Sequence, residues 1–273
     1  MKTVAGFFDG LTAIEPSFQM EGPWRGAFEL DGHHARCVLD SDEWLRLSVS
    51  LTGCATEFIR QQGRLRLPVK IASGPILLAE MPSTDDLGST FAILCAALRE
   101  GLVFLETGSE TVAAAEEMET GVNARLKPLL EESAFDWIQD SGYFSASIET
   151  ARVIAEADEA SATFRTDVVP LGTATDSSLR ALADFLLALN ARLRFVRGTF
   201  AAATLVLESV LPMVALTPML IDCAVGAITT TLPTAKPACR ALLNIHVARQ
   251  YLEFHGAAGP QQNAGLIDAR GFV

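Results

Sequence analysis

The side chains best suited to chemistry gather between positions 31 and 43. The stretch "HHARC" supplies His33, His34 and Cys37, all of types that bind zinc. A zinc site needs about four converging ligands, however, and adjacent residues of a strand point to opposite faces of a sheet. Cys54 could join them, but no fourth ligand is evident. We therefore predict hairpin histidines and no metal.

Acidic side chains follow directly. Asp40, Asp42 and Glu43, with Asp31 nearby, could supply general acid–base catalysis or hold a cation. They lie in turn-forming sequence, where aspartate accepts hydrogen bonds from the local backbone, so we expect a solvated turn. One alternative stays open: an enzyme or small-molecule binder that joins these acids to the two histidines in a cleft between two lobes.

Two further glutamates end long apolar stretches. Glu80 closes "RLRLPVKIASGPILLAE" and Glu208 closes "RLRFVRGTFAAATLVLE". Arg64 and Arg192 begin these stretches and could pair with the glutamates across a hairpin, for about 0.2–1 kcal/mol each. We expect a structural role for these four residues. His246, on an apolar helix, is expected to be a hydrogen-bonded core histidine.

Local signatures of catalysis are absent from the sequence. It contains no G-x-S-x-G, P-loop, G-x-G-x-x-G or H-E-x-x-H motif. We therefore name no catalytic residue and no cofactor, and we favour a non-catalytic function.

The two apolar stretches belong to an internal repeat. At an offset of 128 residues, Leu65 lies over Leu193 and Glu80 over Glu208. Upstream, "ARCVLDSDE" lies over "ARVIAEADE". Each half reads as helix, three strands, helix, two strands, helix and helix. The sequence therefore predicts an α+β fold with two repeated lobes, each an antiparallel sheet with helices packed on one face.

Periodicity places the individual elements. Alternation of apolar and polar residues predicts strands at 26–30, 35–39, 44–51, 143–148, 151–157 and 162–169. Helical spacing predicts helices at 4–14, 87–101, 129–138 and 176–189, with a closing helix in each half at 108–121 and 235–255. Asp176 and Thr234 are expected caps, and Gly101 an expected stop. The nearly uncharged segment 199–232 is predicted to be a buried strand followed by a buried helix.

These elements divide the chain into four parts. We predict a first lobe at 1–107, a helical connection at 108–139, a second lobe at 140–256 and a flexible tail at 257–273.

Composition limits the partners. With 273 residues, 49% of them hydrophobic, the chain can bury a large core. Its net charge of −12 disfavours nucleic acid and anionic membranes. Five scattered cysteines, an odd number, are typical of reduced thiols in the cytoplasm.

The element order, the acidic charge and the phrase "ILLAEMPSTDD" after a strand resemble the type III secretion chaperone-like superfamily, which includes the Tir chaperone type. The resemblance covers 24–105 and 140–255. It implies small domains that homodimerise and hold an extended segment of a partner, so two copies imply an intramolecular pseudo-dimer. The second copy departs from the pattern, because "ESVLPMVALTP" replaces "EMPSTDD".

Two tryptophans complete the sequence reading. Trp24 precedes the first strands and Trp44 opens the third, and aromatic residues are preferred interface anchors. Each could contact a partner or belong to the structure of the chain itself, and Trp44 could contact the other half or pack under a nearby loop or strand end. We predict a protein- or peptide-binding module, a chaperone-like or regulatory adaptor, as a monomer or homodimer. A structural subunit of a larger assembly is a further hypothesis.

Overall fold

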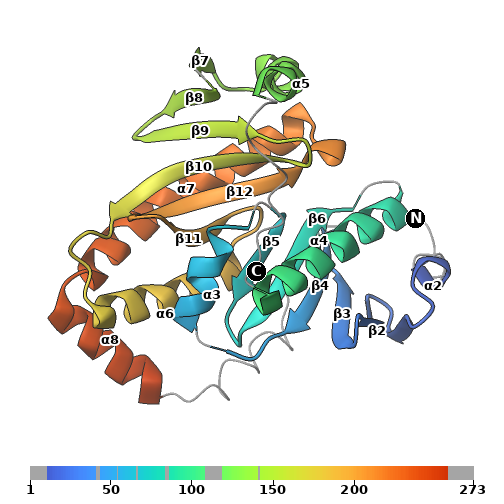
Figure 1. Cartoon of the computed structure of the whole chain (residues 1–273), viewed down its shortest axis with the longest axis horizontal. Coiled ribbons are helices and arrows are strands. Elements are labelled where there is room, and N and C mark those ends of the chain that lie inside the picture. The colour runs from blue at the N-terminus through green and yellow to red at the C-terminus, as the bar shows by residue number, and fades with distance from the viewer. Residues whose placement is uncertain are drawn as a thin grey trace.

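Two six-stranded antiparallel sheets with the same strand order form the framework of the chain (Figure 1). The computed structural model describes residues 11–40, 44–53, 55–65, 67–83, 86–107, 119–140 and 142–257. The first sheet has the order β1-β2-β3-β4-β6-β5, and the second has the matching order β7-β8-β9-β10-β12-β11. The predicted α+β fold with two repeated lobes is confirmed.

The bounds of the strands follow the predicted alternation closely. The first sheet contains β1 (Gln19–Gly22), β2 (Arg25–Leu30), β3 (His33–Leu39), β4 (Trp44–Ser50), β5 (Val69–Ala72) and β6 (Ile76–Pro82). The second contains β7 (Ile138–Asp140), β8 (Tyr143–Ile148), β9 (Ala151–Ala157), β10 (Ser161–Pro170), β11 (Arg197–Ala201) and β12 (Thr204–Pro212). All six strands predicted from alternation are present, and so are the two further strands expected in each half. The opening strands β1 and β7 were not predicted, because strands of four and three residues, none of them buried, give no apolar alternation.

Helices cover one face of each sheet. They are α2 (Leu11–Ile14), α3 (Ala55–Gln62), α4 (Leu87–Thr107), α5 (Glu119–Glu131), α6 (Asp176–Arg192), α7 (Pro218–Leu242) and α8 (Ile245–Ala257), with a short 3₁₀ turn at Met213–Ala215. Helix α4 packs on β4 and β6, and α7 packs on β10 and β12. Helices α3 and α6 lie between the lobes, since each contacts both β5 and β11.

Several helix ends differ from the sequence prediction. Helix α6 is capped by Thr175, whose side chain accepts from the Ser178 amide, and not by Asp176. Gly101 does not stop α4, because its bare backbone lies against Leu77 and Val69 and lets the helix pack closely on the sheet.

Other helices begin and end elsewhere than predicted. The helix expected at 235–255 with Thr234 as its cap is instead the end of α7, which continues through two internal prolines, followed by α8. Most of the expected helix at 129–138 is absent, since α5 (Glu119–Glu131) ends three residues into that range and Ile138 begins a strand. Residues 1–10 and 108–118, where helices were also predicted, lie outside the described residues.

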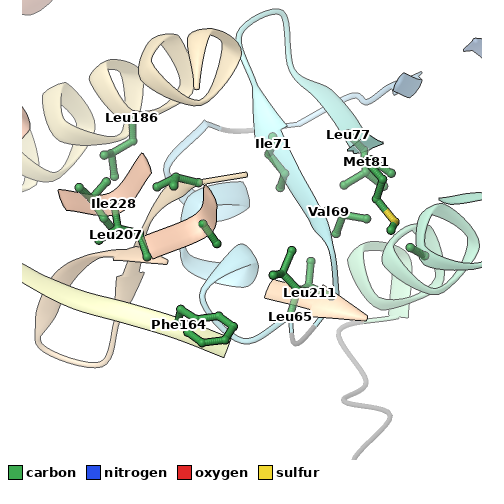
Figure 2. Packing of buried hydrophobic residues seen from close by; sticks show 14 of the residues in the cluster. Leu65, Val69, Ile71, Leu77, Met81, Phe164, Leu186, Leu207, Leu211 and Ile228 are labelled. Carbon is green, nitrogen blue, oxygen red and sulfur yellow. The ribbon is translucent and has the colours of Figure 1, made fainter. Parts of the chain in front are cut away.

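One hydrophobic core runs through both lobes. Leu65, Val69 and Ile71 of the first lobe belong to the same buried cluster as Leu207 and Leu211 of the second (Figure 2). Because the core is continuous across the lobes, we treat the chain as one packing unit. The lobe boundaries at 107, 140 and 256 stay a prediction.

The apolar segment 199–232 is resolved as the predicted strand and helix, β12 and α7. Among the described residues, α4 is the helix long and apolar enough to span a membrane by length and composition, and half of its most apolar window is buried inside the structure. A helix that packs on a sheet meets the same criterion.

Gly226 offers a test of the packing around α7. A methyl group added there would meet nothing within 4 Å, although the residue lies in the interior of a 25-residue helix. Glycine in a helix interior costs about 0.8–1.0 kcal/mol relative to alanine. Gly226→Ala is therefore expected to raise the free energy of unfolding by roughly that amount in equilibrium urea denaturation. A decrease in the free energy of unfolding would show that other atoms pack against the face of α7 that carries Gly226.

Candidate functional site

The most elaborate polar structure lies in the seam between the lobes, where β5 and β11 are the facing edges of the two sheets. Both are outermost in their own sheet, so their outer backbone groups need partners. Two fully buried amide side chains at equivalent repeat positions, Gln62 and Asn190, supply them.

The hydrogen bonds made by the two amides are reciprocal. Gln62 accepts from the Ile71 amide on β5 and donates to the Gly198 carbonyl on β11 at 3.1 Å. Asn190 donates to the Ile71 carbonyl at 3.0 Å and accepts from the Gly198 amide at 2.6 Å. Each amide therefore bonds to both lobes, and the two edges are closed to any other strand at this point.

Two buried cations continue the reciprocal pattern. Lys70 on β5 pairs with Glu80 and donates to the Leu193 carbonyl of the second lobe. Arg197 on β11 pairs with Glu208 at 2.7 Å and donates to the Leu65 carbonyl of the first lobe. Leu65 and Leu193 are the residues that the repeat superposes.

Arg197 makes the larger set of contacts. Its guanidinium also donates to the carbonyl oxygens of Leu67, at 3.0 Å, and of Val69. The Arg197 and Glu208 side chains are only 4% and 7% exposed. Burial of the Lys70 ammonium lowers its pKa, and the neighbouring Glu80 carboxylate opposes that shift. These charges hold the lobes together and do not form a solvent-accessible acid–base pair.

The predicted partners of the glutamates are corrected by these contacts. Glu80 pairs with Lys70 and, at 3.2 Å, with Arg46, while Glu208 pairs with Arg197. Arg64 and Arg192 are exposed instead. The partners of the two glutamates lie on the neighbouring strands β4, β5 and β11 and not at the start of each stretch.

Trp44 lies in the same seam. It is 8% exposed, its ring meets Phe195 edge-on with 4.4 Å between ring centroids, and the Arg194 guanidinium lies 5.3 Å above it. Arg194 also pairs with Asp40 at 2.9 Å. Of the two contacts left open for Trp44, the structure therefore shows the contact with the other half.

The seam contains a small cavity of about 30 Å³, lined by residues of both lobes that include Lys70, Glu80 and Phe195. A volume of that size accommodates a water molecule and no larger substrate. The alternative of a catalytic cleft also required Asp40 near the two histidines. His33 and Asp40 instead lie at opposite ends of β3, about 20 Å apart along the strand.

The remaining candidate residues are dispersed over the first lobe. His33 contacts Glu106 at 3.1 Å and His34 lies 3.8 Å from Glu29. Cys37 is buried on the face of β3 opposite His34, where desolvation raises the pKa of its thiol well above the ordinary value. Among the described residues, no three His, Cys, Asp or Glu side chains gather in an arrangement that could hold a metal.

The remaining predicted residues lie away from the seam or outside the described part of the chain. Asp31 pairs with Arg99 at 3.4 Å in the β2–β3 turn. His246 is exposed in the first turn of α8, so the prediction of a core histidine is wrong. Cys54, Asp42 and Glu43 lie outside the described residues.

Trp24 occupies a different environment, at the outer edge of the first sheet. It lies in the turn between β1 and β2 and is 47% exposed, while its carbonyl accepts from the Leu39 amide at 2.9 Å. Met20 on β1 is 50% exposed. No described strand pairs with β1 on the side away from β2. An open strand edge with two large apolar side chains is suited to contact with another chain.

Comparisons with known proteins find structural similarity but no sequence match. No protein-family model matches the chain, and no curated protein sequence does. Among solved structures, the chain is similar to one in the structure of the HopA1–SchA chaperone–effector complex, with 13% identity and a TM-score of 0.33, covering 42% of this chain and 95% of that one. A TM-score this low supports no conclusion about the site.

Proposed function

We propose that this chain is a non-catalytic protein-binding module, which adds an extended segment of another protein to the open edge of β1. The exposed Trp24 at the end of that strand carries the proposal. Strand addition takes its affinity from main-chain hydrogen bonds and its specificity from side chains beside the edge. The strand supplies the backbone groups, and Trp24 with Met20 supplies apolar contact area.

The rest of the structure is consistent with binding at this position. The inner edge strands β5 and β11 each form hydrogen bonds with a side chain of the other lobe, so they are closed to a partner. The outer edge of the second sheet, β7, has only three residues, Ile138 to Asp140, and Asp140 accepts a hydrogen bond from the Tyr143 hydroxyl. The β1 edge therefore offers the better combination of length and aromatic surface.

Trp24→Ala is expected to abolish retention of partner proteins without unfolding the chain. An aromatic anchor contributes about 2 kcal/mol or more to an interface, equivalent to roughly a 30-fold loss of affinity. The measurement is affinity capture from the native lysate, with the retained proteins quantified by mass spectrometry. Unchanged urea denaturation would exclude a folding defect.

Phe254→Ala is the matched control, because Phe254 is 77% exposed on α8 at the far end of the second lobe. The wild type and Phe254→Ala should retain the same proteins. If Trp24→Ala retains them equally well, Trp24 is not the anchor. If no variant, including the wild type, retains any protein reproducibly, the binding function itself is refuted.

A further inference from the structure

The charge beside the open edge indicates the chemistry of the segment that would add to it. Glu21 lies at the irregularity between the paired residues Met20 and Gly22 of β1, and it is exposed. The Glu21 carboxylate forms no hydrogen bond or ion pair with another described residue. A strand lying alongside Met20 to Gly22 would place a side chain next to this carboxylate.

Exposed charges of both signs lie around Glu21, since Arg36 of β3 pairs in register with Ala27 of the neighbouring strand β2. The β1–β2 hairpin carries Glu21 and Glu29 against one arginine, Arg25. Arg25 pairs in register with Gly22, and its side chain lies over that glycine, at the turn end of the hairpin. The chain as a whole has a net charge of −12. An acidic segment would therefore be repelled at long range, and Glu21 is the acidic group that lies on the open edge strand itself.

Side chains of an edge strand alternate between the two faces of the sheet. Met20 pairs with Gly26, the residue two positions after Trp24, and Phe18 packs under Gly26 in the core. Apolar side chains of an added strand would contact Met20 on this helix-covered side, and Trp24 lies in the turn that follows β1. The alternating side chains of that strand would then face solvent and Glu21.

We propose that the β1 edge selects an extended segment in which apolar residues alternate with lysine or arginine, and that Glu21 provides the preference for a basic residue. This inference rests on the proposed strand addition at β1. Opposite charges on neighbouring strands contribute a modest amount, so the expected preference is about two- to five-fold in affinity.

Three fluorescently labelled peptides test the preference: valine alternating with lysine, with serine or with glutamate. In fluorescence polarisation at low ionic strength, the wild type should bind the lysine peptide about two- to five-fold more tightly than the serine peptide, with the glutamate peptide weakest. Glu21→Gln should lower the ratio of the affinities for the lysine and serine peptides, because only the long-range attraction of the net charge remains. Glu21→Lys should reverse the order of the lysine and glutamate peptides.

Glu253→Gln is the control for net charge, because Glu253 is an exposed residue of α8, remote from β1 in the fold. It should keep the wild-type preference. If Glu21→Gln keeps that preference as well, the selectivity comes from overall charge and the role of Glu21 is refuted. Equal binding of the lysine and serine peptides by the wild type refutes the preference but leaves strand addition standing. If none of the three peptides binds, both proposals fail.

Discussion

Arg197→Ala is expected to lower the free energy of unfolding by about 3–5 kcal/mol, because it leaves a buried carboxylate without its partner. The guanidinium holds the Glu208 carboxylate through its Nε at 2.8 Å and through Nη2 at 2.7 Å. It also satisfies the carbonyl oxygens of Leu65, Leu67 and Val69 in the other lobe. Equilibrium urea denaturation, followed by far-ultraviolet circular dichroism, measures the loss.

Arg165→Ala is the matched control for this experiment. Arg165 lies on β10 directly opposite Glu208, but it pairs with Glu156 and its side chain is 35% exposed. A partly exposed ion pair contributes at most about 1 kcal/mol, so Arg165→Ala should be mild. Equal losses in the two variants would contradict the special place of Arg197 in the seam.

The reciprocal seam explains why the two lobes behave as one unit. Each lobe contributes an edge strand, a buried amide and a cation paired with a glutamate, and each cation reaches the equivalent leucine carbonyl of the opposite lobe. Such reciprocity is the property of a twofold interface between identical subunits. In this chain the two repeated lobes make such reciprocal contacts with each other.

The sequence predicted the architecture well, because the repeat and the strand alternation are periodic signals. Superposing Leu65 on Leu193 placed two hairpins that the structure shows in equivalent positions of the two sheets. The same offset superposes Gln62 on Asn190, but the two differ in residue type and carry no local motif. Their role depends on which edges meet, and periodicity does not contain that information.

Long-range contacts account for the other errors. Strand alternation places Trp44 on the more polar face of β4, which it shares with Arg46 and Ser48, yet the side chain is buried. Phe195, which covers Trp44, comes from the second lobe, about 150 residues later in the chain. In the same way, a proline usually ends a helix, yet α7 continues past Pro233 and Pro237 because its inner face is buried against the second sheet.

Asn190→Ala is expected to lower the free energy of unfolding by roughly 2–5 kcal/mol. The substitution removes the bonds to the Gly198 amide at 2.6 Å and to the Ile71 carbonyl at 3.0 Å. Both groups stay buried on facing strand edges, where water does not replace the lost partner, and each such group costs about 1–3 kcal/mol. Gln250→Ala on the exposed side of α8 is the control and should change stability by less than about 0.5 kcal/mol.

A double-mutant cycle with Gln62→Ala tests whether Gln62 and Asn190 stabilise the two strands together or as two independent hydrogen-bonding sites. Gln62 and Asn190 both bond to Ile71 and to Gly198, so removing the first amide loosens the strands that the second must hold. We expect the double variant to lose less than the sum of the single losses, with a coupling of about 0.5–3 kcal/mol in urea denaturation. Strict additivity would mean that the two edges are held separately, and the reciprocal seam would then not be the element that unites the lobes.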